Sequence, residues 1–123
     1  MTRMMQLDPI SLFKSLSDPS RLAIIMMLKA ENELCVCEFT EALNEVQPKI
    51  SRNLALLKTN GVVVNRREGQ WIYYSINPEL PEWAQEVVNQ TYAGNHQLIA
   101  DAMTKLEKVG PSSDRPNILC CGS

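Results

Sequence analysis

The chain has 123 residues, of which 45% are hydrophobic and 21% charged, and a formal net charge of −2. These values predict one small globular domain and exclude a uniformly basic protein. The first ten residues contain no apolar signal-peptide core, and the longest apolar run, Leu22 to Leu28, is too short to span a bilayer. We therefore expect a cytoplasmic protein with reduced cysteines, which argues against a disulfide framework and favours metal or redox chemistry at the 4 thiols.

The first third of the chain is predicted to be helical. Residues 7–17 favour a first helix with apolar side chains on one side. Asp18 and Pro19 then indicate a new start, because aspartate caps helices and proline suits the first helical position. The next helix, residues 21–30, is apolar almost all round, so we expect it to be the central buried helix.

Residues 33–61 predict two short amphipathic helices joined by a tight turn. Pro48 opens the second helix, and Asn60-Gly61 ends it in the manner usual for helix C-termini. The buried faces are defined by apolar residues at helical spacing: Val36, Phe39 and Leu43 in the first helix, and Ile50, Leu54 and Leu57 in the second. This arrangement is a helix-turn-helix.

A β-hairpin is predicted after the helix-turn-helix. Residues 62–65 and 71–76 are rich in β-branched and aromatic residues, and residues 66–70 between them form a basic tip that contains glycine. A hairpin in this position is typical of a winged helix-turn-helix. The expected fold is therefore mainly α with a small β-hairpin.

The C-terminal region predicts one long helix from residue 82 to about 108. Its apolar positions alternate steps of four and three, as in a heptad seam that packs on a second helix. We interpret this helix as the dimer interface of a homodimer. The predicted dimerisation residues are Val88, Tyr92, Ile99 and Leu106. Residues 1–109 would thus form the DNA-binding and dimerisation domain, and residues 110–123 a flexible tail that contains cysteines.

Basic residues are concentrated between positions 47 and 70, with 5 basic side chains against Glu68 alone, whereas the rest of the chain has 7 basic and 13 acidic ones. One basic segment on an acidic body is typical of a local phosphate-binding surface. Recognition helices enter the major groove by their N-terminal end, where Gln and Arg contact bases and Lys and Ser hold phosphates. The alternative is a solvated basic helix in a protein-interaction domain. The residues expected to contact double-stranded DNA are Gln47, Lys49, Ser51, Arg52, Lys58, Arg66 and Arg67.

Cys35 and Cys37 are predicted to lie near the start of the first helix of this motif. Residues i and i+2 of a regular helix are separated by about 200°, so one ion cannot bind both sulfurs without a change in this turn. Metal binding would then distort the helix-turn-helix and oppose DNA binding. A helix N-terminus lowers the pKa of a thiol, and thiolates select thiophilic ions over magnesium or calcium. The alternative is a pair of small buried hydrophobic side chains.

The remaining candidate groups are few. Cys120 and Cys121, in the tail, are further candidate metal ligands, which would complete the same site, bind separately or do nothing. His96 is the only histidine, which excludes a histidine-rich metal site within one chain. No Gly-rich phosphate loop, nucleophile elbow or supported acid/base pair occurs in the sequence, which argues against an enzyme.

The chain resembles the ArsR/SmtB family of winged-helix metalloregulatory repressors over about residues 8 to 108. The resemblance is carried by residues 17–22 (SDPSRL), 33–38 (ELCVCE), 47–58 (QPKISRNLALLK) and 69–74 (GQWIYY). The ELCVC motif is specific to the arsenic-responsive branch. The resemblance implies a homodimer that binds operator DNA ahead of an arsenic-resistance operon. It also implies that the repressor dissociates when arsenite or antimonite binds Cys35 and Cys37.

One position departs from the family pattern. The best-known arsenic sensors of this type carry a third cysteine where this chain has Thr40. Trivalent arsenic typically takes three thiolates, so Cys120 or Cys121, from the same subunit or its partner, could fill the third place. A two-thiolate site completed by hydroxide or an external thiol is the alternative. The ligand set of the zinc- and cobalt-sensing relatives is missing from the C-terminal helix.

We therefore expect an arsenite-responsive transcriptional repressor. Two other functions remain as alternatives. One is a repressor of the same fold that senses oxidants through its thiols. The other is a structural-zinc protein-interaction module in which the cysteines hold one zinc ion.

Overall fold

The computed structural model describes residues 7–111 and 114–120, except for the side chains of residues 117, 118 and 120. Its helices are α1 (Pro9–Leu16), α2 (Pro19–Glu31), α3 (Val36–Leu43), α4 (Gln47–Thr59), α5 (Glu82–Gly94), the 3-10 helix η2 (His96–Ile99), α6 (Ala100–Val109) and α7 (Arg115–Cys120). Its strands are β1 (Leu34–Cys35), β2 (Val63–Glu68) and β3 (Trp71–Ile76). No helix in the described part of the chain is long and apolar enough to cross a membrane.

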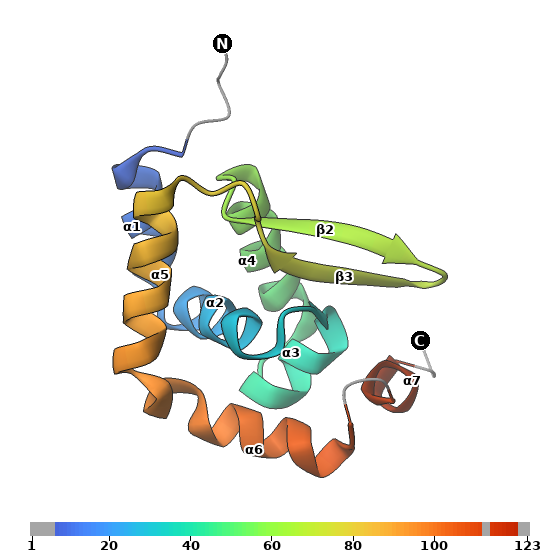
Figure 1. The fold of residues 1–123 in the computed structure, drawn as a ribbon. Helices are drawn as coiled ribbons and strands as arrows, with labels where there is room; N and C mark the ends of the chain where they lie inside the picture. Colours follow the sequence, from blue (N-terminus) through green and yellow to red (C-terminus); the bar gives the residue numbers. More distant parts are fainter. Residues whose placement is uncertain (1–6, 112–113, 121–123) are drawn as a thin grey trace.

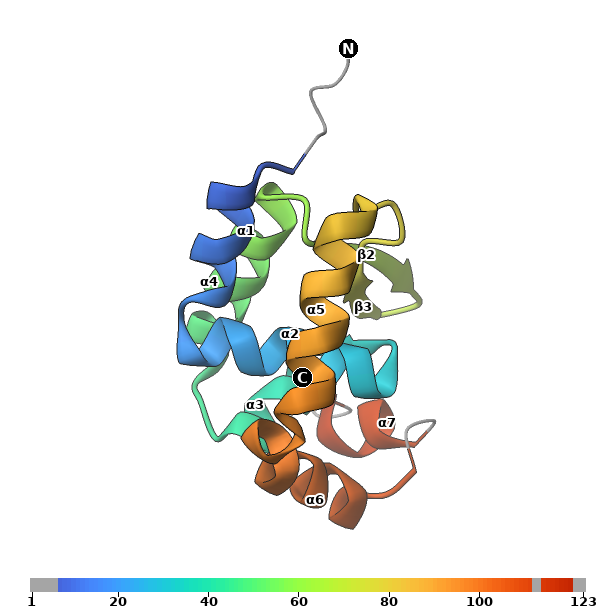
Figure 2. The same ribbon diagram turned by 60° about the vertical axis from the view of Figure 1, so that its left-hand side comes forward.

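The start of α2 is fixed as the sequence predicts. The Asp18 carboxylate accepts hydrogen bonds from the backbone N–H groups of Ser20 and Arg21 at 3.0 and 3.1 Å, and Pro19 is the first helical residue. Residues 24–28 of α2 are at most 1% exposed, and the helix lies in the middle of the other helices (Figures 1 and 2). The prediction of a central buried helix is confirmed.

The helix-turn-helix and its wing are also confirmed. Helices α3 and α4 are joined by a short turn that begins with Asn44 in the left-handed conformation. Strands β2 and β3 pair in antiparallel register and project away from the helices (Figure 1). The sheet contains a third strand that the sequence did not predict. Strand β1 pairs with β3, with Leu34 opposite Tyr74 and Cys35 opposite Tyr73, so the sheet order is β1-β3-β2.

The prediction of one long C-terminal helix is wrong. The helix ends at Gly94, and the chain turns at Asn95 before η2 and α6. Glycine has low helix propensity, and the Asn95 side-chain amide donates to the Thr91 carbonyl at 2.9 Å, which replaces a helical backbone bond. As a result α6 turns beneath α3 (Figures 1 and 2), with which it packs.

This bend changes the role of the predicted dimer seam. Val88, Ile99 and Leu106 are 2%, 3% and 0% exposed and belong to the chain's own hydrophobic core, and Tyr92 is half-buried against it. The stripe thus meets helices of the same chain, and the assignment of these four residues to a dimer interface stays a prediction. Homodimerisation itself stays a prediction.

The predicted flexible tail contains an ordered segment that the sequence did not indicate. Helix α7 packs against α3 and lies beside it in both views (Figures 1 and 2). The Arg115 side chain at its start is almost fully buried. Residues 112–113 and 121–123 lie outside the described part of the chain.

Candidate thiol sensor and nucleic-acid interface

Cys35 lies at the junction of β1 and α3. It is the last residue of the strand and the N-cap of the helix, with φ −96° and ψ 168°, and it is 2% exposed. The expectation that both thiols lie within a regular helix and off the buried face is therefore wrong for Cys35. The physical reason is the pairing with β3, which keeps the chain extended as far as Cys35. Cys37, in the first turn of α3, is half-buried.

Cys35 and Glu38 form a capping box. The Glu38 Oε1 atom accepts a hydrogen bond from the Cys35 backbone N–H at 2.9 Å, and the Cys35 sulfur accepts one from the Glu38 backbone N–H. Burial, and to a smaller extent the nearby Glu38 carboxylate, raises the pKa of the Cys35 thiol to about 11. The expected lowering of this pKa by the helix N-terminus is thus wrong, because desolvation and a like charge outweigh it.

Cys37 is disulfide-bonded in the structure. This differs from the expectation that all cysteines are reduced, and it means that the Cys37 sulfur must be reduced before it can bind a metal.

Thr40, at the position of the third cysteine in the best-known sensors, donates a hydrogen bond from its hydroxyl to the Cys37 carbonyl at 2.9 Å. Among the described side chains, no group of three or more His, Cys, Asp or Glu residues could hold an ion.

The tail cysteines are described only in part. Cys120 is the last residue of α7, and its side chain lies outside the description. Cys121 lies outside the described residues altogether. The described residues therefore bring 2 cysteines to the N-terminus of α3, which fits a thiophilic ion that takes sulfur ligands but leaves its third ligand to be identified.

The DNA-binding candidates on α4 lie on its accessible side. Gln47, Arg52 and Lys58 are exposed, and Lys49 and Ser51 are half-buried. The Gln47 side-chain amide donates to the Ser51 hydroxyl at 2.7 Å, and the Lys49 ammonium lies 3.3 Å from the Glu45 carboxylate. These contacts hold the Gln47 and Lys49 side chains against neighbouring residues. Arg52 and Lys58, in contrast, are exposed to solvent.

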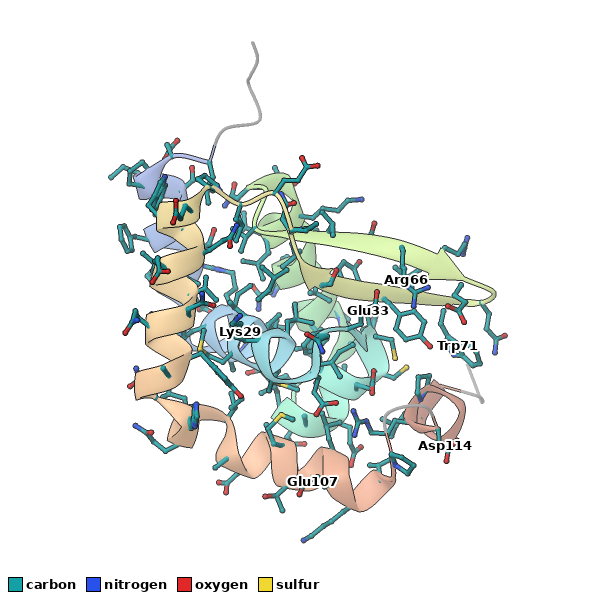
Figure 3. All side chains as sticks on the ribbon, in the orientation of Figure 1. Lys29, Glu33, Arg66, Trp71, Glu107 and Asp114 are labelled. Carbon is teal, nitrogen blue, oxygen red and sulfur yellow. The ribbon has the colours of Figure 1, made fainter. Side chains whose placement is uncertain are left out.

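The two wing arginines differ in their surroundings. Arg66 donates to Glu33 from Nε at 2.7 Å and from Nη2 at 2.8 Å, and to Glu68 from Nη1 at 2.6 Å. Its guanidinium carbon also lies 4.8 Å from the centre of the Tyr73 ring. Figure 3 shows Arg66 above Glu33, beside the strand β3. Arg67 is exposed. The positive charge of Arg66 is thus compensated within the protein, whereas Arg67 faces solvent.

Sequence comparison decides the family. A model of the bacterial regulatory protein, arsR family, matches residues 18–64. The arsenic resistance transcriptional regulator ArsR2 of Pseudomonas putida is 44% identical over 93% of this chain and 99% of its own length. The chain belongs to the arsR family. The arsenical resistance operon repressor of Escherichia coli is 38% identical over 89% of this ArsR-family chain and 94% of its own length.

Solved structures agree with this assignment. HlyU from Vibrio cholerae superposes with a TM-score of 0.63 at 28% identity and covers 72% of this chain and 91% of its own. The transcriptional repressor BigR from Xylella fastidiosa gives a TM-score of 0.58 at 32% identity, with 68% and 82% coverage. The winged-helix architecture of this ArsR-family protein is therefore shared with known transcriptional regulators.

Three charged residues near the thiols were missed by sequence reasoning: Glu33, Glu38 and Arg115. The capping-box pattern, an acceptor followed three residues later by glutamate, could have indicated Glu38 if cysteine had been read as a cap. No short-range signal pairs Glu33 with Arg66, which is 33 residues away, or Glu38 with Arg115, which is 77 residues away.

Proposed function

We propose that this ArsR-family protein is an arsenic-responsive transcriptional repressor. It binds operator DNA and releases it when arsenite binds the reduced thiols of Cys35 and Cys37. The observation that carries the proposal is the position of Cys35, which ends a strand paired with the wing strand β3 and caps the first helix of the helix-turn-helix. The arsenic-resistance names of the two full-length relatives support the choice of arsenic.

The position of Cys35 gives a physical reason for release. Its sulfur is a capping acceptor for α3, and its backbone belongs to β1. Bonding of the Cys35 sulfur to an ion shared with Cys37 would compete with its role as capping acceptor for α3. Ligand binding would therefore shift the start of α3 and the pairing of β1 with β3. Because α3 packs on the recognition helix α4 and β3 is itself a strand of the wing, ligand binding and DNA binding would oppose each other.

The DNA-binding surface in this proposal has two parts. Gln47, Lys49, Ser51, Arg52 and Lys58 act from α4, and Arg66 and Arg67 from the wing. One recognition helix per chain reads one half-site, so the repressor acts as a homodimer on double-stranded operator DNA in the cytoplasm. Since the seam of α5 and α6 is buried, the dimer surface is assigned to exposed apolar side chains: Ile10 and Phe13 of α1, Trp83 of α5, and Leu98 of η2.

The ligand is assigned by its sulfur chemistry. Trivalent arsenic forms stable bonds to thiolates, and trivalent antimony shares this preference, so antimonite is proposed as a second inducer.

Operator binding by fluorescence anisotropy tests the function. DNA from upstream of the protein's own gene is bound by protein reduced with tris(2-carboxyethyl)phosphine, and arsenite or antimonite is then titrated. Release by either metalloid, with no release by zinc, is the expected result. Tight binding that survives saturating arsenite would overturn the arsenic response, and failure to bind any upstream DNA would overturn the repressor function. Unfolding on addition of a zinc chelator would instead favour the structural-zinc module.

A second candidate function is favoured by the disulfide at Cys37. A repressor of this fold could respond to oxidants by forming that bond, which requires two-electron oxidation of two thiols by an added peroxide. The same anisotropy assay distinguishes the two functions. Release of the reduced protein by peroxide in the absence of metalloid would support the oxidant response, whereas unchanged binding after the disulfide has formed would exclude it.

A further inference from the structure

The corner between α1 and α2 meets the recognition helix α4 through buried polar side chains. Ser15, at the end of α1, is fully buried, and Asn53, in the middle of α4, is 8% exposed. Residues 17–22 of this corner carry part of the family resemblance, but none of them belongs to the thiol site or to the proposed DNA-binding surface. Because buried polar groups form hydrogen bonds, the partners of these side chains show what the corner holds.

The corner holds the middle and the C-terminal end of α4. Arg21 Nη1 donates to Asn53 Oδ1 at 3.4 Å, and the Asn60 side-chain amide donates to the Ser15 hydroxyl at 3.0 Å. Asn53 and Asn60 are seven residues apart, which places them on the same side of a helix with about 3.6 residues per turn. One side of α4 is therefore bonded to the corner along about two turns.

The same side chains fix the end of α1. Arg21 donates from Nε to the Ser15 carbonyl at 3.0 Å and from Nη2 to the Lys14 carbonyl at 3.1 Å. These carbonyls lie in the last turn of the helix, where the backbone leaves acceptors without a helical partner. The Ser15 hydroxyl donates to the Ser11 carbonyl at 2.8 Å. One guanidinium thus joins the end of α1 to the middle of α4.

A third contact lies at the N-terminal end of α4. The hydroxyl of Ser20, the second residue of α2, donates to Glu45 Oε2 at 2.7 Å, in the turn before α4. The Lys49 ammonium of α4 lies 3.3 Å from the same oxygen. The corner therefore contacts the recognition helix before its start, in its middle and at its end, and Figure 2 shows α1 and α4 side by side.

These hydrogen bonds restrict α4 in a way that its apolar contacts do not. Ile50, Leu54 and Leu57 are fully buried and fix which side of α4 faces the core, but hydrophobic burial is non-directional. Hydrogen bonds weaken steeply when the donor angle falls below about 120°. Rotation or sliding of α4 would therefore break the bonds of Asn53 and Asn60, so the corner sets the orientation of the recognition helix.

We propose that the polar side chains at this corner are positioning residues that set the spacing and angle at which the dimer presents its two recognition helices to operator DNA. This corner network consists of Ser15, Arg21, Asn53 and Asn60. Its role rests on the proposed repressor function and deepens it, because it assigns the half-site spacing of the operator to side chains outside the proposed DNA-binding surface.

Helix α1 connects the corner network to the proposed dimer surface. Ile10 and Phe13 of α1 are 64% and 52% exposed, whereas Ser15 of the same helix is buried against α4. One face of α1 is thus available to the partner chain, and another is hydrogen-bonded to the recognition helix. In a two-fold dimer, this connection fixes the distance between the two recognition helices, and that distance has to match the distance between the operator half-sites.

Operators with altered half-site spacing test this role in the reduced full-length protein. The half-sites are located in upstream DNA by footprinting, and the spacer is shortened or lengthened by one base pair, which turns one half-site by about 35° relative to the other. By fluorescence anisotropy, the wild type should bind its own spacing at least about tenfold more tightly than either altered spacing, which corresponds to the loss of about one base contact. Asn53→Ala/Asn60→Ala should bind all three operators within about threefold, because α4 is no longer fixed.

Thr104→Ala is the control variant. It removes one side-chain hydrogen bond, of 3.0 Å to the Ala100 carbonyl, from α6, which lies at the other end of the molecule from α1 (Figures 1 and 2). It should keep the wild-type spacing preference. Ser15 and Asn60 are partners in one bond, so Ser15→Ala/Asn60→Ala should lose no more of the preference than Asn60→Ala alone. Additive losses would overturn the assignment of that bond.

The outcomes separate this role from the proposed function. A folded Asn53→Ala/Asn60→Ala protein that keeps the wild-type spacing preference would overturn the positioning role, even if its free energy of unfolding has fallen. A wild type that binds all three spacings equally would also overturn it, but would leave operator binding and the arsenite response intact. A wild type that binds no upstream DNA would refute the proposed function and this role with it. If circular dichroism shows that the double variant is unfolded, Ser15→Ala replaces it, since it removes only one hydroxyl, and the same loss of spacing preference is expected.

Discussion

Glu33 holds Arg66 by two hydrogen bonds, of 2.7 Å from Nε and 2.8 Å from Nη2. The Arg66 guanidinium lowers the pKa of the Glu33 carboxyl, chiefly through these bonds. Glu33 precedes β1 and lies two residues before Cys35, whereas Arg66 lies on the wing strand β2. The wing arginine is thus tied to the segment that leads into the thiol site, and its charge is compensated before any DNA approaches.

Release of Arg66 from Glu33 should strengthen DNA binding. Glu33→Gln removes one carboxylate from Arg66, and we expect operator affinity to rise about threefold, the size of a typical surface charge interaction. The measurement is anisotropy at several salt concentrations. Glu107→Gln, which makes the same charge change on α6 far from the hairpin (Figure 3), is the control. Equal gains in both variants would show that only net charge matters.

Arg52 should carry more of the DNA affinity than Arg66. It is exposed on the N-terminal half of α4, and loss of an arginine contact typically costs about 1–3 kcal/mol. Arg52→Ala should therefore weaken operator binding without changing the oligomeric state, as measured by anisotropy and analytical ultracentrifugation. Lys105→Ala serves as the control, and unchanged affinity of the Arg52 variant would remove this residue from the interface.

Cys35→Ser should separate DNA binding from sensing. Serine is nearly isosteric with cysteine and is a good N-cap, so the capping box with Glu38 and the fold should persist. The variant should bind operator DNA like the wild type but keep it when arsenite is added. Normal release by arsenite would refute the assignment of Cys35 as a ligand.

The buried thiol should make stability depend on pH in the alkaline range. The pKa of Cys35 is raised from 9.0 to about 11, so between these values the folded chain holds a proton that the unfolded chain has lost. The free energy of unfolding therefore falls as pH rises through this window, and the contribution is constant below it. Urea unfolding of reduced wild type and Cys35→Ala at pH of about 8, 9.5 and 10.5 measures this. Above pH of about 9, the free energy of unfolding should fall faster for the wild type than for Cys35→Ala. If it falls equally in both proteins, burial does not raise the pKa of Cys35.

Leu106 and Phe13 should respond to mutation in different ways. Leu106 is fully buried in the chain's own core, whereas Phe13 is 52% exposed on α1. Leu106→Ala should lower the free energy of unfolding by about 2–5 kcal/mol, as measured by urea unfolding. Phe13→Asp should leave the core intact but weaken the proposed dimer, as measured by sedimentation. A dimer that survives Phe13→Asp but not Leu106→Ala would restore the α5–α6 seam as the interface.

The sequence by itself determined the helix-turn-helix, the wing and the family. Each of these rests on signals within a few residues: the cap at Asp18 and Pro19, the helical spacing of apolar residues, and the motif that contains Cys35 and Cys37. Helix caps and hairpins depend on neighbouring residues, so they can be predicted without knowledge of the packing.

Only the tertiary structure decided how these parts are connected. It placed Cys35 at the end of a strand, buried it and so reversed the expected direction of its pKa shift. It bent the C-terminal helix at Asn95, which turned a predicted dimer seam into core. It also paired Glu38 with Arg115. Burial and ion pairs between distant residues depend on which elements meet in space, and no local pattern carries that information.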